Sequence, residues 1–576
     1  MQIIRRPYDL AQSRFSDQIH PLLQRIYLAR GIYSEQMIDR QLSALPSPAS
    51  MHGLSDAVAL LTATLRAKEK IVIVGDFDAD GATSSALMVL ALGALGFTEV
   101  SFLVPNRFDY GYGLTPEIVD LAAQQQPQLI VTVDNGISSL EGVAHANALG
   151  IKVIVTDHHL PGKKLPAAAA IVNPNQPACQ FPGKNLAGVG VAFYLLSALR
   201  AQLREDNWFT EKGIPEPNMA TWLDLVALGT VADVVPLDQL NRALVHQGLM
   251  RIRSGNCRPG ITALLSVAGR NPARLVSSDL AFALGPRLNA AGRLDDISLG
   301  IQCLLTEDPQ MSLDTARLLD ELNQDRKVIE QDMQREAISI VNQLHLEKQG
   351  DIPEALCLFQ PEWHQGVVGL LASRIKEKFH RPVIAFARAE GGELKGSARS
   401  VSALHIRDTL DVVATKNPGL IEKFGGHAMA AGLSLKEQNL AAFTESFRCE
   451  TAERLSDEDL QASVLTDGVI ASDQINREVA WILRESGPWG QHFPEPTFEG
   501  TFIVKHQRIV GEKHLKLILA TEEQPERNID AIHFNADTSV WPGPAIERVH
   551  CVFKLDINEY RGLEKVQLLV DLIDSQ

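Results

Sequence analysis

The chain has 576 residues, too many for one ordinary hydrophobic core, and this length predicts three or four domains. Its composition, 45% hydrophobic and 22% charged, is that of a globular protein and excludes a largely disordered chain. The net charge of −16 argues against a surface that binds polyanions everywhere, although basic stretches can still bind them locally.

Two stretches depart from this acidic average. Residues 241–278 contain six arginines and no acidic residue, and residues 371–407 contain eight Lys or Arg against three Glu. Each stretch is either a solvated face or a local surface for nucleic acid.

The sequence predicts neither a secretory signal nor a membrane span. The start, "MQIIRRPYDLAQSRF", does not resemble a secretory signal, and no run of eighteen apolar residues predicts a membrane span. The six cysteines (179, 257, 303, 357, 449 and 551) form no CxxC pair. They are expected to be reduced thiols of a cytoplasmic protein.

The first half of the chain predicts an N-terminal segment and one α/β domain. Residues 1–50 are expected to be irregular or helical. Residues 51–200 alternate β-branched runs such as "KIVIVGD" and "QLIVTVDNG" with Ala/Leu-rich segments, the pattern of βαβ units and a parallel sheet. Residues 201–345 are expected to be mainly helical, to complete this domain and to end in a connecting helix of roughly 40 Å.

The second half predicts two further domains. Residues 346–455 return to α/β alternation, with runs such as "ALCLF" and "PVIAFAR". Residues 456–576 contain short strands separated by turns, including "HLKLILA" and "KVQLLVDL". This tail is expected to form a small β-barrel of the oligonucleotide-binding (OB) type.

Acidic residues and histidines follow the apolar runs of the first domain. The run "KIVIVGDFDADG" ends with Asp76, Asp78 and Asp80, which an extended chain would point to one side. The other segments end with Asp134, with Asp157, His158 and His159, and with Asp233, whose segment is either a strand or a helix. Ligands of an open parallel sheet bind outside the carboxyl ends of its strands, so we expect these side chains to converge at one edge.

Such a cluster predicts a metal site. A lone aspartate after a strand usually caps a helix or forms a turn, but four such segments in one chain favour a shared site. Clustered carboxylates cannot all be ionised without a counter-charge. Carboxylates with one or two imidazoles suit Mn²⁺ or Mg²⁺ better than Zn²⁺. Two such ions about 3.5–4 Å apart catalyse phosphoester hydrolysis, which is the chemistry that the spacing predicts.

The order of the motifs resembles a known family. "GDFDADG", "VDNG", "TDHH" and "GTVADVVPL" are similar to the motifs of the DHH phosphoesterase superfamily. "VPNRFDYGYGL", "GPRLNAAGRLDD", "KGSARS" and "FGGHAMAAGLSL", with the β-rich tail, narrow the resemblance to its single-strand-specific exonucleases over about residues 50–576. Val74 stands where many members carry a metal-binding histidine, a departure for which Asp76 is expected to compensate.

The resemblance implies a role for each residue at the sheet edge. The implied metal ligands are Asp78, Asp80, Asp134, His158 and Asp233. His159 is implied to face the scissile phosphate or its leaving oxygen, and Asp76 to be a ligand or a base. Asp157 is expected to orient a histidine ring through the other ring nitrogen. Adjacent residues of an extended chain point to opposite sides, so the sequence leaves open which histidine ligates.

A second set of residues is expected to bind the DNA backbone. "FGGHAMAAGLSL" predicts a glycine turn at the start of a helix, where N–H groups bind anions. The resemblance implies that this is the glycine-histidine motif of a DHHA1 domain, with Gly426 and His427 on the phosphates. Ser397 and Arg399 are expected to anchor a terminal 5′-phosphate.

Other candidates for DNA contacts are more scattered. Arg107 reaches a phosphate or forms a surface salt bridge. Arg287 and Asn289 are expected to contact the backbone from the segment between the domains. His364 either joins them or caps and packs within the fold. The basic tail stretch "TFIVKHQRIVGEKHLKLIL" offers Phe502 and His506 for stacking on bases.

The function implied by the resemblance is a 5′→3′ exonuclease that degrades single-stranded DNA to mononucleotides with Mg²⁺ or Mn²⁺. Recombination and repair, including mismatch and base-excision repair, are the implied processes, and a single-strand-binding protein and a helicase are the implied partners of a monomer. A phosphodiesterase for cyclic dinucleotides or very short RNA is the first alternative, which the β-rich tail disfavours. A non-catalytic strand-binding scaffold is the second, which the intact acids disfavour.

Overall fold

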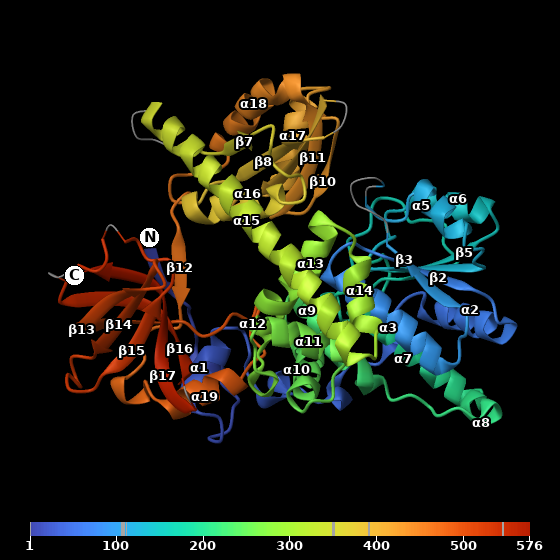
Figure 1. Ribbon diagram of the computed structural model, residues 1–576, viewed down its shortest axis with the longest axis horizontal. Coiled ribbons are helices and arrows are strands. Elements are labelled where there is room, and N and C mark those ends of the chain that lie inside the picture. Colours follow the sequence, from blue (N-terminus) through green and yellow to red (C-terminus); the bar gives the residue numbers. More distant parts are fainter. Residues whose placement is uncertain are drawn as a thin grey trace. The chain divides into compact units, whose positions relative to one another are not determined.

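A computed structural model of the chain describes residues 2–104, 110, 112–347, 352–389, 392–538, 540–543, 546–560 and 562–575. The chain forms two compact units, and Figure 1 labels their helices and strands. The larger unit contains residues 5–320 and residues from 465 onward. The smaller unit contains residues 321–464 and the first few residues of the chain.

A parallel sheet forms the centre of the first part of the larger unit. Its strand order is β3-β2-β4-β5-β6, and all neighbouring strands are parallel. The strands are β2 (Ile71–Gly75), β3 (Val100–Leu103), β4 (Leu129–Val133), β5 (Lys152–Thr156) and β6 (Ala170–Val172). Every residue of β2 and β4 is buried, as expected for a parallel sheet with helices on both faces.

Two pairs of helices cover this sheet. Val72 and Val74 pack with α5 (Pro116–Ala123) and α6 (Leu140–Ala148) on one face. The other face contacts α3 (Ala79–Leu95) and α7 (Gly188–Glu205), and Figure 1 shows the two pairs on opposite sides. The helix α2 (Leu54–Ala67) packs on α7. This layered arrangement leaves the carboxyl ends of the strands free to carry a site.

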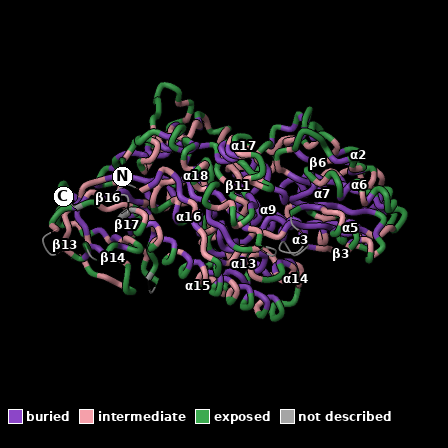
Figure 2. The backbone as a smooth tube through the Cα atoms, turned by 90° about the horizontal axis from the view of Figure 1, so that it is seen from above, coloured by how far each residue is buried: buried purple, intermediate pink, exposed green. Residues whose placement is uncertain are grey.

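Helices follow the sheet, as the sequence predicts for residues 201–345. The helix α9 (Leu223–Ala232) is apolar all round, and its residues up to Val231 are all buried. Figure 2 shows the buried stretches of α3, α7 and α9 in purple. The further elements are α8 (Trp208–Lys212), α10 (Gln239–Arg253), α11 (Pro259–Val267), α12 (Ser277–Asp279), the π-helical η7 (Leu280–Leu284), α13 (Gly285–Leu294) and α14 (Ser298–Leu305).

The helix α15 (Pro309–Glu347) is longer than the sequence pattern predicts. Its 39 residues correspond to about 58 Å of helix, not roughly 40 Å. The apolar periodicity marks only the part of a helix that packs, so the polar turns at its ends are missing from the pattern.

The smaller unit contains a second sheet, with strand order β10-β11-β9-β8-β7. Only the pair β7 and β8 is parallel among these strands. The strands are β7 (Leu356–Phe359), β8 (Val383–Arg388), β9 (Glu393–Arg399), β10 (Lys423–Gly426) and β11 (Ala430–Lys436). One face contacts α16 (Val368–Phe379), and the other packs with α17 (Ile406–Lys416) and α18 (Leu440–Ala452) around Phe443 and Phe447.

The stretch "FGGHAMAAGLSL" forms a β-hairpin, so the prediction of a helix start there is wrong. Gly426 has φ +140°, and the amide of His427 donates to the carbonyl oxygen of Ala430 at 2.8 Å, which closes the turn between β10 and β11. Along β11, Ala431 pairs with Ala398 of β9. Small residues are good helix formers in isolation, but the hydrogen-bond ladder with β9 overrides that preference.

The tail forms a closed five-stranded barrel with strand order β13-β14-β15-β17-β16. Its strands are β13 (Phe498–Val510), β14 (His514–Ala520), β15 (Ile529–His533), β16 (Arg548–Tyr560) and β17 (Leu563–Ser575). Phe502 is buried against Phe553 in the barrel core, so its predicted stacking on bases is wrong, whereas His506 is exposed. The helix α19 (Arg477–Glu485) packs on β16, and α1 (Pro21–Leu28) places Tyr27 against Trp489.

The predicted fold class is confirmed: a parallel α/β domain with helices, a smaller α/β domain and an OB-like barrel. Among the described residues, no helix combines the length and the apolar character needed to cross a membrane. All six cysteines are free thiols, in agreement with their scattered spacing.

Candidate metal centre

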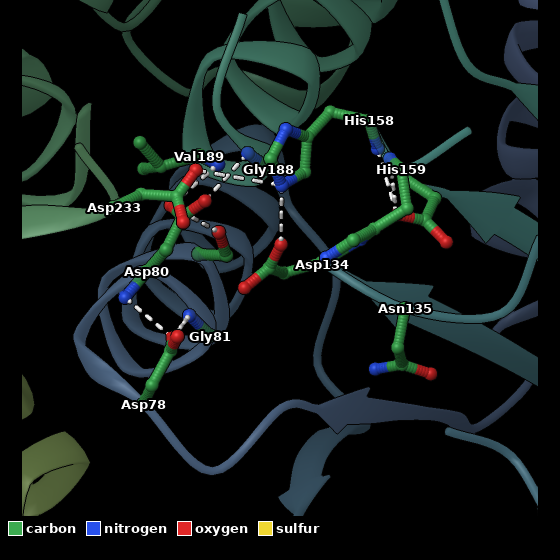
Figure 3. Close-up of polar contacts among 12 residues, drawn as sticks. Asp78, Asp80, Gly81, Asp134, Asn135, His158, His159, Gly188, Val189 and Asp233 are labelled. Atoms are coloured by element: carbon green, nitrogen blue, oxygen red, sulfur yellow. Dashed lines mark hydrogen bonds and ion pairs between the residues drawn. The ribbon is translucent and has the colours of Figure 1, made fainter. Parts of the chain in front are cut away.

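The loop between β2 and α3, together with the first turn of α3, carries three of the predicted acids. The strand ends at Gly75, and Asp78 is the N-cap residue of α3. Its carboxylate accepts the amides of Asp80 at 2.9 Å and Gly81 at 3.1 Å, which fixes the first turn of the helix. Asp76 is buried in the same loop. The alternating acids therefore lie together at the start of α3, as Figure 3 shows for Asp78 and Asp80.

Asp80 is held by the start of another helix. Its two carboxylate oxygens accept the amides of Gly188 at 2.6 Å and Val189 at 2.9 Å, the first residues of α7. A helix N-terminus favours a negative charge there. Burial and the nearby charge of Asp78 nevertheless raise the pKa of Asp80 to about 7. The chain thus fixes the position of this carboxylate without neutralising it.

Asp134 follows β4 at the point where the strand order reverses between β2 and β4. Its φ of +61° turns the chain sharply at the strand end. The neighbouring Asn135 donates from Nδ2 to the carbonyl oxygens of Val74 at 3.1 Å and Val133 at 2.9 Å. This side chain therefore ties the two strands together below the site, and ligands of open parallel sheets bind at such a reversal.

The two adjacent histidines have different partners. His158 Nε2 lies 3.1 Å from Asp134 Oδ1 and 3.5 Å from Asp233 Oδ2. His159 Nδ1 lies 2.7 Å from Asp157 Oδ1, and the amides of both histidines also donate to that oxygen. The strand has ended at Thr156, so the two rings are no longer on opposite sides of an extended chain.

The electrostatics of Asp157 and His159 follow from this contact. Burial opposes the charge of Asp157, but the hydrogen bond and charge of His159 and the amide of Ile137 lower its pKa overall. Burial also opposes the charge of His159, but the bond and charge of Asp157 raise the pKa of the imidazole overall. The contact with Asp157 thus favours the protonated form of the His159 ring, which is one-third exposed at the edge of the cluster.

Asp233 follows a helix and not a strand. It is the C-cap residue of α9, which settles the alternative left open by the sequence. Its side chain is 19% exposed, and burial with the charge of Asp80 raises its pKa well above the ordinary value. Burial and the charges of Asp80 and Asp78 do the same for Asp134.

Three overlapping groups of side chains have potential ligand atoms within 4.8 Å of one another. They are Asp80 with His158 and Asp233, Asp76 with Asp78 and Asp134, and Asp134 with His158 and His159. Asp134 Oδ1 and Asp233 Oδ2 are buried and accept no hydrogen bond from the described residues. Buried oxygens of this kind and five mutually repelling carboxylates fit divalent cations with oxygen and imidazole ligands.

Arg399 belongs to a separate cluster in the smaller unit, with Ser397 and the start of α16. Gly369 of this helix is so close that an added Cβ would lie 3.2 Å from Arg399 Nη2 and 3.3 Å from Ser397 Oγ. Arg399 donates from Nε to Ser373 Oγ at 3.2 Å and from Nη1 to the carbonyl oxygen of Ala398 at 2.8 Å. Burial lowers the pKa of its guanidinium, and no carboxylate of the described residues forms an ion pair with it.

The hairpin turn lies at the same end of β9 as Arg399. Ala430 pairs with Arg399, and the amide of Ser400 donates to the carbonyl oxygen of Met429 at 3.0 Å. The structure therefore brings the predicted Gly426 and His427 near the end of β9 that carries Ser397 and Arg399. His427 is exposed there.

Two other predicted DNA contacts have partners inside the fold. Arg287 is buried, with Nη2 2.7 Å from Asp320 Oδ1. Asn289 Oδ1 accepts the amide of Ala79 at 2.7 Å, so its side chain supports the loop that carries Asp78. Arg107 lies outside the described residues.

Two residues of the segment before α16 also contact the fold. His364 Nδ1 accepts the amide of Gly366, in agreement with the capping alternative. The neighbouring Trp363 is buried and donates from Nε1 to Glu336 at 2.8 Å.

Some residues of the site escape the sequence pattern. The amides of Gly188 and Val189 hold Asp80 from more than a hundred residues away, and only the small residues of "LAGVGVAF" hint at a close approach. Tyr112 places its hydroxyl 3.3 Å from His159 Nδ1 and donates to the carbonyl oxygen of Asp134 at 3.3 Å. Gly229 of α9 is required because an added Cβ would lie 2.9 Å from Asp80 Oδ1.

Three parts of the chain match family models. Residues 70–230 match the N-terminal domain of the DHH family, residues 353–452 match the DHHA1 domain, and residues 466–571 match the RecJ OB domain. With the parallel sheet and the acidic cluster at its edge, these matches define a metal-dependent phosphoesterase of the DHH family.

Similar proteins narrow the family further. The single-stranded-DNA-specific exonuclease RecJ of Dickeya dadantii is 54% identical over 99% of this chain and 98% of its own length. RecJ of Escherichia coli is 54% identical over 96% of each chain. The crystal structure of RecJ from Thermus thermophilus in complex with Mn²⁺ has a TM-score of 0.80 and 30% identity, covering 100% of this chain and 79% of that one. The chain belongs to the RecJ family.

Proposed function

We propose that this protein is a single-stranded-DNA-specific exonuclease that hydrolyses phosphodiester bonds with two metal ions. It degrades the strand 5′→3′, releases mononucleotides and acts in recombination and repair, including mismatch repair. The observation that carries the proposal is the convergence of buried carboxylates and His158 at one sheet edge, in a chain of the RecJ family.

The residues that hold the ions follow from the three groups of side chains. Asp80, His158 and Asp233 would hold one ion, and Asp76, Asp78 and Asp134 the other. The ions are Mg²⁺ or Mn²⁺, and RecJ structures from Thermus thermophilus contain each of them. When bound, two such ions activate water and stabilise the charge that develops on the leaving oxygen.

His159 is assigned to the substrate phosphate. Its Nδ1 is engaged by Asp157, so Nε2 is the nitrogen presented to the reacting group. The raised pKa of the ring favours a cation that can stabilise phosphate charge or donate a proton to the leaving oxygen. Asp157, held by three backbone amides, acts by orienting this ring.

The cluster around Arg399 is assigned to the terminal 5′-phosphate. A half-buried guanidinium with no carboxylate partner among the described residues retains an unbalanced charge, and a phosphate can accept from it bidentately. The helix start at Gly369 adds amides that favour an anion. Ser397, Gly426 and His427 would complete the contacts to the phosphates.

The closed barrel is assigned to the single strand, which OB folds track by charge and stacking. A single-strand-binding protein and a helicase are proposed as partners of a monomer that acts in the cytoplasm. Arg107, Arg287 and Asn289 remain predicted contacts to the DNA backbone, although the internal partners of Arg287 and Asn289 support a structural role as well.

The test compares Asp134→Asn with Asp120→Asn. Asp120 is an exposed aspartate on α5 whose carboxylate lies 2.7 Å from His145 Nε2 of the neighbouring helix α6. Labelled single-stranded DNA, duplex DNA, short RNA and a cyclic dinucleotide are incubated with Mn²⁺. Wild type and Asp120→Asn should release mononucleotides from single-stranded DNA, and Asp134→Asn should lose at least about 100-fold in rate. Unchanged activity of Asp134→Asn would contradict the metal assignment, and preferred cleavage of the cyclic dinucleotide would contradict the substrate.

A further inference from the structure

A π-helical segment lies immediately before α13. Within η7 (Leu280–Leu284) the amide of Gly285 bonds to the carbonyl oxygen of Leu280, five residues earlier. Such single π turns are rare and occur frequently at functional sites, since they shift side chains relative to a regular helix. In this segment Leu280, Ala283 and Leu284 are buried, whereas Phe282 is 80% exposed.

One face of α13 lines the loops that carry the acids. Asn289 accepts the amide of Ala79, and an added Cβ at Gly292 would lie 1.9 Å from the carbonyl oxygen of Phe77. An added Cβ at Gly285 would lie 3.2 Å from the Cβ of Ala232, the residue before Asp233. These three positions are spaced i, i+4 and i+7, so they share one side of the helix.

Phe282 lies three residues before Gly285, within the π turn that continues α13 toward the amino terminus. One helical turn is about 5 Å and consecutive Cα atoms are about 3.8 Å apart, which places Phe282 on the order of 10 Å from Asp233. That is the length of about three stacked nucleotides at roughly 3.4 Å each. A strand whose reacting phosphate lies at the metals therefore has its nearest bases within reach of Phe282.

The segment that contains Asp233 exposes a second apolar side chain. Val234 is 60% exposed, and its φ of +62° is an outlier for a β-branched residue. Strained backbone of this kind clusters at functional sites, where it positions a particular side chain. Val234 adjoins Asp233 in the chain, and Phe282 lies three residues before Gly285, which lies against Ala232. Both exposed apolar side chains therefore belong to the segments that meet around Ala232 and Asp233.

The charges of the site indicate what covers this surface. The two ions and His159 account for the reacting phosphate, whereas the guanidinium of Arg287, next along α13, is engaged by Asp320. Phe282 and Val234 can offer only uncharged contacts to the nucleotides that flank that phosphate. Stacking of a base on an aromatic ring is such a contact, and it tolerates every base because each has a π face.

We propose that Phe282, supported by Val234, is a stacking platform for a base of the single strand next to the metal centre. The inference rests on the proposed function and names one positioning residue for it. Phe282 holds the nucleotides that flank the reacting phosphate, without regard to sequence, and takes no part in the chemistry.

The test uses Phe282→Ala and Phe282→Trp with a matched control. Leu149→Ala removes an exposed apolar side chain at the end of α6, before β5 and thus at the opposite edge of the sheet. The probe is a 5′-phosphorylated oligothymidylate and the same strand with abasic sites in its first nucleotides. Binding is measured with Ca²⁺ in place of the catalytic ion, and degradation with Mn²⁺.

Phe282→Ala should weaken binding of the oligothymidylate about tenfold and raise its KM similarly. It should leave binding of the abasic strand unchanged, because no base is present to stack. Phe282→Trp should restore tight binding, and Leu149→Ala should match wild type on both strands. An equal loss on both strands, or no loss on either, would overturn the inference. If wild type itself fails to degrade single-stranded DNA, the proposed function is wrong instead.

Discussion

The metal centre is built from negative charges and the Arg399 cluster from a positive one, yet both lack a counter-charge within the protein. At the metal centre, carboxylates from four segments lie together, and burial raises the pKa values of Asp80, Asp134 and Asp233. In the smaller unit, the half-buried guanidinium of Arg399 lies beside a helix start with no acidic partner among the described residues. Each region keeps a charge that the protein does not neutralise, of the sign opposite to its expected ligand.

Other buried charges of the molecule show the contrast. Asp224 accepts from Arg258 Nη1 at 2.8 Å and from the Arg258 amide at 3.0 Å, and Arg30 donates to both carboxylate oxygens of Asp467. In these pairs each charge is compensated by its partner within the fold. A buried charge therefore indicates a ligand site here only where its counter-charge is missing.

The largest expected effect in this comparison is the loss of activity in Asp134→Asn, because this carboxylate belongs to two of the three ligand groups. The Arg399 cluster should contribute less, since it binds a part of the substrate that does not react. Variants of Arg399 and Asn289 distinguish residues that position the substrate or the metal from residues that take part in the reaction.

Arg399→Ala should weaken binding of 5′-phosphorylated single-stranded DNA about tenfold or more, because charge-assisted hydrogen bonds to the phosphate are lost. Binding of the same strand with a 5′-hydroxyl should change much less. Dissociation constants of both strands measure the effect. Arg388→Ala is the matched control, since Arg388 lies on the neighbouring strand β8 and forms an exposed ion pair with Glu437. Equal losses on the two strands would contradict the role as an end anchor.

Asn289→Ala should have the smaller effect of about fivefold on the Mn²⁺ concentration required for activity. The variant removes the acceptor of the Ala79 amide and so loosens the loop with Asp78. The activity at saturating Mn²⁺ should stay close to that of wild type. The control is Asn147→Ala, which removes a hydrogen bond from Asn147 of α6 to the carbonyl oxygen of Ala167. This variant should leave the Mn²⁺ dependence of the activity unchanged. A loss of activity at saturating Mn²⁺, with an unchanged Mn²⁺ concentration required for activity, would indicate that Asn289 contacts DNA instead.

The sequence predicts the acidic residues of the site better than the groups that hold them in place. Continuous apolar runs, typical of buried parallel strands, precede Asp76, Asp78, Asp80 and Asp134. The place where these acids meet therefore follows from the geometry of a parallel sheet. The amides of Gly188 and Val189 could not be found in this way, because a backbone donor has no side-chain signature. The role of Asn289 likewise depends on a contact between segments far apart in the chain.

Local preference also misleads where tertiary pairing decides the structure. The small residues after Gly426 suggest a helix, but pairing with β9 makes them a strand. The apolar run before Asp233 fits strand and helix equally, and its burial on all sides makes α9 a helix without amphipathic pattern. Burial of Phe502 in the barrel follows strand alternation, which the basic residues around it obscure.

The count of bound metal ions tests the central claim most directly. Calorimetric titration of the metal-free chain with Mn²⁺ at pH 6.5 should show two ions per chain. Protons should be released on binding, because burial raises the pKa of Asp80 to about 7 and the ions require the ionised carboxylates. Asp134→Asn should bind fewer than two ions, and Asp120→Asn should bind two. A single ion in wild type, or two ions in Asp134→Asn with unchanged affinity, would contradict the account of the site.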